Sequence, residues 1–222
     1  MCGIVGYLGE RDSLPIILNG LKRLEYRGYD SSGIAVHNGS TIASCKSKGK
    51  ISKLEKQLEK RKNIHGGLGI GHTRWATHGE PNDVNAHPQF SNSKKLCLVH
   101  NGIIENYSTI KQKLIKEGFT FHSETDTEVL VNLIEFIKNK HNVKLGEAVQ
   151  ISLNQVVGAY AIAVINNDKP DEIVVAKLGS PLCIGIGEDE HFIGSDVTPF
   201  IEFTKDVVYL EDGELAVIRN HK

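Results

Sequence analysis

The sequence has no long hydrophobic run and no recognisable targeting segment. No apolar stretch approaches the roughly 20 residues that a membrane-spanning helix needs. The N-terminus also lacks the basic region and hydrophobic stretch of a signal peptide. These absences argue against an integral membrane protein, and we expect a cytoplasmic protein without a membrane partner.

Cysteine is scarce and scattered. The four cysteines form no C-x-x-C pair and lie far apart, at Cys2, Cys45, Cys97 and Cys183. A disulfide framework or a cysteine zinc site needs closer and more regular spacing. We therefore expect no disulfide, and we expect at least three of these thiols to lie in the core.

Metal and nucleotide motifs are also missing. The ten histidines fit no zinc spacing, and H-E-x-x-H does not occur. The glycine cluster GGLGIG at 66–71 lacks G-x-G-x-x-G spacing and leads into HTRWAT rather than a helix pattern. We expect neither a metal nor a cofactor, and we interpret His87 and His100 as hydrogen-bonding scaffold residues.

Neither sign of charge dominates the chain. Twenty-six basic and 27 acidic residues leave a formal net charge of -1, which gives no indication of nucleic-acid binding. The one basic concentration spans 46–62, where Ile51, Leu54 and Leu58 recur at helical spacing with glutamates among the lysines. This pattern predicts a solvated amphipathic helix rather than a binding patch.

Apolar periodicity predicts an α+β fold. A buried strand starts almost at the N-terminus with CGIVGYLG, and LCLVH predicts another that ends at Asn101-Gly102. Two strands should meet at Asn38-Gly39 in a type I′ hairpin turn. Further predictions are a strand in GGLGIGHTRW, a polar loop over 76–95, a helix from Ser13 to about Gly28, helices near 110–118, 127–140 and 146–156, and six short strands after 157. Successive strands without intervening helices favour antiparallel sheets with helices grouped outside them.

Cys2 is the most informative residue for function. Removal of Met1, which is normal before a small side chain, would leave Cys2 with a free α-amine. That amine has a reference pKa of about 7.7 to 8.0, so it can take the thiol proton and produce the attacking thiolate. A cysteine after Met1 is more often incidental than catalytic, so the case for a catalytic Cys2 depends on the remaining motifs.

Five motifs in order carry a family resemblance. They are EYRGYDSSG, GHTRWATHGEP, NAHP, HNGIIENY and SETDTE, all between residues 25 and 128. The series resembles class II glutamine amidotransferases, in particular the glutaminase domains of the glucosamine-6-phosphate synthase family, and later segments such as GAYAIAVI extend the resemblance over nearly the whole chain. It implies a four-layer αββα sandwich of the N-terminal-nucleophile hydrolase type, with residues 1–222 forming one glutaminase domain.

The resemblance implies a site that cleaves the side-chain amide of L-glutamine. Cys2 would be the nucleophile. The Asn101 side-chain amide and the Gly102 backbone N–H resemble the family's oxyanion hole, whose donors face the oxygen that becomes negative in the tetrahedral intermediate. Arg74 resembles the residue that holds the substrate carboxylate through its planar guanidinium, and Asp126 the residue that pairs with the substrate ammonium.

Four further substrate-binding residues follow from the same motifs. Thr77 and the backbone near His78 would assist the carboxylate clamp. Trp75 resembles a residue on a loop that closes over glutamine and excludes water from the thioester. Arg27 matches a position at the pocket mouth, although a salt bridge at a helix end explains it equally well.

The implied reaction passes through a γ-glutamyl thioester on Cys2 and releases ammonia and glutamate. In the family, a sugar-isomerase domain uses the ammonia to convert fructose 6-phosphate into glucosamine 6-phosphate, and the full-length enzyme would be a homo-oligomer. We expect that second domain to be absent from these 222 residues. The activity of the domain depends on removal of Met1, since a retained methionine would block the α-amine of Cys2.

Three alternatives compete with this interpretation. The first is the glutaminase domain of another amidotransferase, in purine or asparagine synthesis; the purine branch typically varies EYRGYD and has tyrosine in place of Trp75. The second is a non-catalytic binding domain of the same fold, which would not need the Cys2 thiol. The third is a papain-like hydrolase, but no G-S-C-W motif surrounds any cysteine.

Overall fold

Two antiparallel β-sheets form the centre of the computed structural model, which describes residues 2–77 and 79–220. The first sheet has the strand order β11-β9-β10-β1-β4-β2-β3. Its strands are β1 (Gly3–Leu8), β2 (Ser31–His37), β3 (Ile42–Lys48), β4 (Leu68–Arg74), β9 (Cys183–Ile186), β10 (His191–Gly194) and β11 (Val207–Tyr209).

The second sheet has five strands in the order β12-β8-β7-β6-β5. They are β5 (Gln89–Phe90), β6 (Leu96–Ile104), β7 (Gly158–Asn166), β8 (Lys169–Leu178) and β12 (Leu215–Arg219). Adjacent strands are antiparallel throughout both sheets. The prediction of antiparallel sheets is confirmed.

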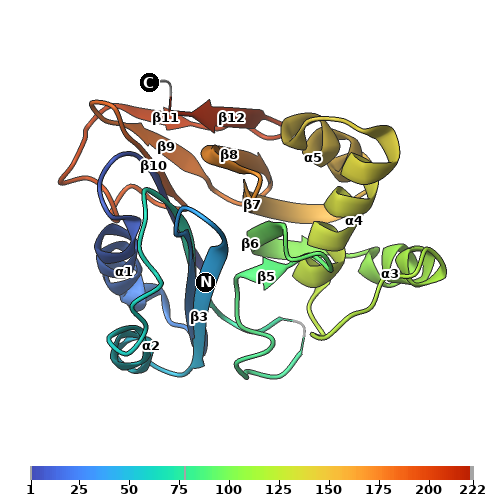
Figure 1. The fold of residues 1–222 in the computed structure, drawn as a ribbon, viewed down its shortest axis with the longest axis horizontal. Coiled ribbons are helices and arrows are strands. Elements are labelled where there is room, and N and C mark those ends of the chain that lie inside the picture. Colours follow the sequence, from blue (N-terminus) through green and yellow to red (C-terminus); the bar gives the residue numbers. More distant parts are fainter. Residues whose placement is uncertain (1, 78, 221–222) are drawn as a thin grey trace.

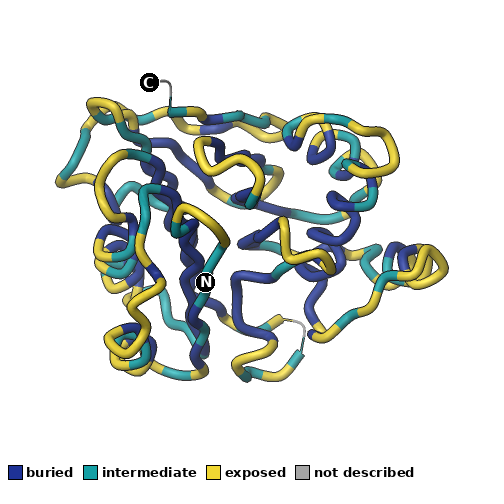
Figure 2. Tube along the Cα trace, viewed as in Figure 1, coloured by how far each residue is buried: buried dark blue, intermediate teal, exposed yellow. Residues whose placement is uncertain are grey.

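Helices cover the outer face of each sheet (Figure 1). They are α1 (Ser13–Arg23), η1 (Glu25–Arg27), α2 (Ile51–Leu58), α3 (Tyr107–Lys116), α4 (Asp126–His141) and α5 (Leu145–Leu153). Buried apolar side chains form one layer beneath α1 and α2, a second between the sheets, and a third beneath α4 and α5. The central strands of both sheets are therefore buried on both faces (Figure 2), which gives the four-layer αββα sandwich that was predicted.

Burial on two faces explains why the strands are continuous apolar runs rather than alternating patterns. In β1, Ile4 and Leu8 point between the sheets, whereas Val5 and Tyr7 pack under the helical layer. The glycines of β4 let α1 approach closely, because a Cβ on Gly71 would lie 2.4 Å from Cγ2 of Ile17. The GGLGIG cluster therefore serves packing, which agrees with the rejection of a nucleotide loop.

Three local predictions need correction. The strand that begins with LCLVH continues through Asn101-Gly102 to Ile104 because β7 pairs with it along that whole length. The Lys-rich helix is confined to Ile51–Leu58, since residues 46–48 complete β3. The first helix ends at Arg23, and a 3-10 turn separates it from Gly28, whose φ is 74°.

The hairpin at Asn38-Gly39 forms, but its turn is not type I′. A type I′ turn has two central residues with positive φ, whereas here Gly39 alone has one, 95°, in a four-residue loop between β2 and β3. The Asn38 side chain explains the longer loop, because its Oδ1 accepts hydrogen bonds from the backbone N–H groups of Ser40 and Thr41. Such Asx turns compete with tighter turns.

Candidate active site

Cys2 lies immediately before β1, next to the C-terminal end of β4. Its Sγ accepts a hydrogen bond from the backbone N–H of Trp75 at 3.2 Å, and the thiol donates to the Trp75 carbonyl at 3.5 Å. Desolvation by burial raises the pKa of this thiol, while the Trp75 contact and the nearby Arg74 charge oppose the shift. The resting thiol is therefore protonated and needs a base before it can attack.

Asn101 reaches Cys2 from the second sheet. Its Nδ2 donates to the Cys2 carbonyl at 3.3 Å, and its Oδ1 lies 2.8 Å from Nε2 of the fully buried His72 on β4. Gly102, the next residue of β6, has a φ of 127°, and a Cβ there would lie 2.0 Å from the Ala159 carbonyl oxygen. Only glycine fits this position without moving β7.

Arg74 and Asp126 place opposite charges beside Cys2. Arg74 is the last residue of β4, is 3% exposed, and donates from Nη2 to the Gly79 carbonyl at 3.3 Å. Desolvation lowers the pKa of its guanidinium, and nearby carboxylates, including Asp126, oppose that shift. Asp126 begins α4, is 4% exposed, and accepts a hydrogen bond from the Ile104 N–H at 2.8 Å.

These groups converge on one small cavity between the ends of the sheets. Its lining is contributed by β4, β6, the start of α4 and the segment after β4, and consists of Cys2, His72, Arg74, Trp75, Thr77, His87, His100, Gly102, Asp126 and Thr127. The enclosed space is about 10 Å³, room for about one water molecule. Thr77 and Trp75 are among these lining residues, and Trp75 is 55% exposed.

Arg27 and Asn101 were predicted as site residues but are not among the side chains that line this cavity; Asn101 contacts the Cys2 carbonyl instead. Arg27 lies in η1 and donates to the Ser195 hydroxyl at 3.2 Å, and that hydroxyl in turn accepts from the Ile4 N–H on β1. Arg27 is therefore tied to the strand that follows Cys2 without facing the cavity. His78 lies outside the described residues, so its predicted place in the carboxylate clamp stays a prediction. Met1 also lies outside the described residues.

Asp30 is a site-shaping residue that sequence reasoning did not single out. Its Oδ2 accepts a 2.6 Å hydrogen bond from the Ala76 N–H, and its own N–H donates to the Arg74 carbonyl at 2.8 Å. It thereby fixes the backbone on both sides of Trp75. Its position in the motif EYRGYDSSG was the available signal, but neither spacing nor periodicity showed that it faces β4.

Three histidines form the buried base of the cavity. His72 stacks on His87 with ring centroids 4.4 Å apart. The Thr127 hydroxyl bridges Nε2 of His87 at 2.6 Å and Nδ1 of His100 at 3.1 Å. The scaffold interpretation of His87 and His100 agrees with these contacts, whereas the contact of His72 with Asn101 was not anticipated. Within the described ranges, no group of three or more His, Cys, Asp or Glu side chains is arranged so that it could hold a metal ion.

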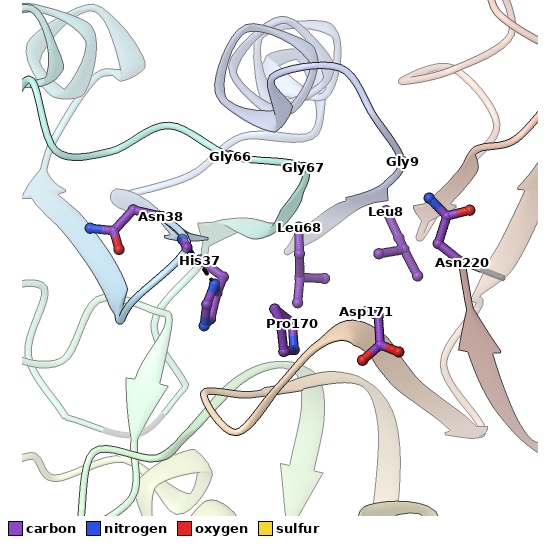
Figure 3. A pocket seen from close by; sticks show the side chains of 11 residues that line it. Leu8, Gly9, His37, Asn38, Gly66, Gly67, Leu68, Pro170, Asp171 and Asn220 are labelled. Atoms are coloured by element: carbon purple, nitrogen blue, oxygen red, sulfur yellow. Dashed lines mark hydrogen bonds between the residues drawn. The ribbon is translucent and has the colours of Figure 1, made fainter. Parts of the chain in front are cut away.

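A larger concavity lies at the other end of the sheets (Figure 3). It measures about 700 Å³ and lies between the end of β1, the start of β4 and the start of β8. Leu8, Leu68 and Pro170 line it with His37 and Asp171, but no cysteine does so. Across residues 2–77 and 79–220, no helix is long and apolar enough to cross a membrane.

Solved structures share this architecture. The glutamine phosphoribosylpyrophosphate amidotransferase from B. subtilis superimposes with a TM-score of 0.82 at 30% identity, covering 99% of this chain and 47% of that one. A class II glutamine aminotransferase domain protein from Silicibacter pomeroyi shares the fold with a TM-score of 0.68 at 14% identity, covering 97% of this chain and 94% of that one. The architecture is that of the N-terminal-nucleophile hydrolases, as predicted.

Sequence comparison gives the family. The glutamine amidotransferase domain matches residues 57–211, and the chain belongs to this family. It is 57% identical to the glutamine–fructose-6-phosphate aminotransferase (isomerizing) of Bacteroides thetaiotaomicron over 100% of this chain and 36% of that protein. The enzyme of the same name from Thermococcus kodakarensis is 50% identical over 98% of this chain and 36% of its own length. The chain thus spans about a third of the curated relatives it matches.

Proposed function

We propose that this chain hydrolyses the side-chain amide of L-glutamine, with Cys2 as the nucleophile after Met1 has been removed. One observation carries the proposal: a thiol, a buried guanidinium, a buried carboxylate and a strand glycine converge on one cavity from four separate segments. Glutamine carries the complementary groups, namely a carboxylate, an ammonium and a cleavable amide.

The proposed roles follow from the charges and the hydrogen-bonding atoms. Arg74 binds the substrate carboxylate, and Asp126 binds the ammonium, so that the amide is presented to the Cys2 thiol. The Asn101 amide and the Gly102 N–H stabilise the oxyanion. Attack forms the C–S bond, expels ammonia after proton transfer to the leaving nitrogen, and leaves a γ-glutamyl thioester that water hydrolyses to glutamate.

The base in this proposal is the α-amine of Cys2. Burial lowers the pKa of His72 to about 3 and holds that of His87 well below its usual range, so neither imidazole takes up a proton near neutral pH. A papain-like pairing of Cys2 with one of these two side chains is therefore disfavoured. The α-amine, with a reference pKa of about 7.7 to 8.0, is suited to accept the thiol proton and to activate the hydrolytic water.

Substrate entry requires the cavity to enlarge, because glutamine is much larger than one water molecule. Residues 75–77 are the part of the cavity wall that we expect to move. Trp75 is half exposed, and three hydrogen bonds hold the backbone of Trp75 and Ala76. Two join the Trp75 backbone N–H and carbonyl to the Cys2 thiol, and the third joins the Ala76 N–H to the Asp30 carboxylate. We infer that this segment opens to admit glutamine and closes to exclude water from the thioester.

The acceptor of the ammonia is assigned from the relatives. Identities of 57% and 50% to glutamine–fructose-6-phosphate aminotransferases exceed the 30% identity to the glutamine phosphoribosylpyrophosphate amidotransferase structure. We therefore propose that the ammonia serves conversion of fructose 6-phosphate to glucosamine 6-phosphate, in a sugar-isomerase domain of a homo-oligomeric enzyme. The remaining length of those relatives is consistent with such a second domain.

Mass spectrometry and a glutaminase assay test the proposal together. Protein shown by intact mass to lack Met1 should release glutamate from glutamine, and Cys2→Ala should abolish the release. Cys45→Ala is the matched control, because Cys45 is a buried core thiol away from the cavity. Reaction with 6-diazo-5-oxo-L-norleucine should modify Cys2 alone. Inactive processed protein, or an active Cys2→Ala variant, would refute the mechanism.

A further inference from the structure

The oxyanion hole depends on the direction in which one amide points. The two ends of the Asn101 side chain have opposite hydrogen-bonding character, and only Nδ2 can donate. If the amide rotated by half a turn, Oδ1 would face the reacting centre and would repel a developing negative charge. Something must therefore fix the rotation of this amide.

We propose that His72 is a positioning residue for the oxyanion hole: its Nε2–H holds Oδ1 of Asn101 and thereby aims Nδ2 at the reacting centre. This inference rests on the proposed glutaminase function. The two atoms lie 2.8 Å apart, within the range of a strong hydrogen bond. The contact joins β4 of one sheet to β6 of the other, directly beside Cys2.

The proton on His72 can be placed by the partners of Asn101. Nδ2 lies 3.3 Å from the Cys2 carbonyl, which only accepts hydrogen bonds, so the amide nitrogen must face Cys2. Oδ1 then faces His72, and Nε2 of His72 must carry a hydrogen. Burial holds the pKa of this imidazole to about 3, which keeps it neutral with a single ring proton at neutral pH.

The surroundings of His72 restrict its ring. The side chain is 0% exposed and stacks on the His87 ring at an interplanar angle of 28°. His87 is itself held by the Thr127 hydroxyl at 2.6 Å, one residue after Asp126. A fixed ring gives a fixed donor direction, which is the condition for effective preorganisation of the oxyanion hole.

A matched pair of substitutions tests this role. Gln and Leu have similar volumes, and both remove the ring stack, but only Gln offers an N–H that can reach Asn101. His72→Leu should lower kcat for glutamine by roughly 10²-fold, near the effect of losing one oxyanion donor, with KM little changed. His72→Gln should recover most of that loss. If His72→Leu does not fold, His72→Phe, which keeps an aromatic ring beside His87, replaces it.

Two readouts separate positioning from structural damage. Alkylation of Cys2 by iodoacetamide displaces iodide at a saturated carbon and forms no oxyanion, so its rate should be the same in wild type and in both variants. In an Asn101→Ala background, His72→Leu should produce no further loss of kcat. Equal kcat for Leu and Gln, a parallel loss of alkylation, or full additivity with Asn101→Ala would overturn the inference.

These outcomes differ from failure of the proposed function. A processed wild-type chain that cleaves no glutamine refutes the glutaminase assignment and the role of His72 with it. An active wild type with a His72→Leu variant of equal kcat refutes the positioning role alone and leaves Cys2 chemistry standing.

Discussion

Acid should destabilise this fold over the pH range in which histidine titrates in the unfolded chain, and His72 offers the clearest measurement. Its ordinary pKa of about 6.5 applies when the chain is unfolded, whereas burial lowers the pKa to about 3 in the folded protein. Between these values the unfolded state binds more protons than the folded state. The free energy of unfolding therefore falls as pH is lowered through this window.

The size of the effect follows from the same two values. One such histidine reduces the free energy of unfolding by up to about 1.4 kcal/mol for each pH unit. The slope is about half of this at pH 6.5, where the unfolded histidine is half protonated, so between pH 6.5 and 4.5 the loss from His72 is roughly 2 kcal/mol. Because the side chain is fully buried, solvent screening does not reduce this figure appreciably. This loss is a substantial fraction of the roughly 5 to 15 kcal/mol of net stability that is usual for a domain.

Urea unfolding of wild type and His72→Leu, measured from pH 7 to pH 4.5, isolates this contribution. Leucine does not titrate, so wild type should lose roughly 2.5 kcal/mol more than the variant over the range. Cys97→Ala is the control, since it alters a buried side chain between the sheets without removing a group that titrates in acid. Its curve should run parallel to wild type. Parallel curves for His72→Leu would refute the reasoning.

Other substitutions test the proposed site and its frame. Asn101→Ala should lower kcat by about 10²- to 10³-fold with a small change in KM, as steady-state glutaminase assays would show; a loss confined to KM would contradict it. Arg74→Lys should reduce kcat/KM by roughly 10- to 100-fold through the loss of a bidentate contact. Asp126→Asn should also weaken glutamine binding. An unchanged glutamine affinity in titration calorimetry would argue against the proposed clamp. Gly102→Ala should lower the melting temperature, because its Cβ would lie 2.0 Å from the Ala159 carbonyl oxygen; an unchanged melting curve would show that β7 can yield there.

The sequence by itself determined the fold class and the chemistry of the candidate site. Continuous apolar runs bounded by turn residues are sufficient to predict strands that are buried on both faces. The order of helices and strands then leaves few architectures besides two sheets with outer helices. Cys2, Arg74 and Asp126 could be named because they fall on motifs that resemble those of a known family, and these three line one cavity in the folded protein.

Some local errors arose because sequence patterns do not show pairing partners. The LCLVH strand was expected to end at Asn101-Gly102, but β7 continues to pair through Ile104, so both residues lie within a strand. The turn at Asn38 was misassigned because its side chain bonds to the backbone two and three residues ahead. Both depend on hydrogen bonds whose partners periodicity does not specify.

Only the tertiary structure decided which side chains act on the site residues. His72 and Asn101 are 29 residues apart in sequence, yet they lie 2.8 Å apart because the two sheets face each other across the cavity. Asp30 meets Ala76 in the same way, through the pairing of β2 with β4. Sequence spacing encodes neighbours on one helix or strand, whereas contacts between sheets depend on how the layers pack, and it is these contacts that orient the proposed catalytic groups.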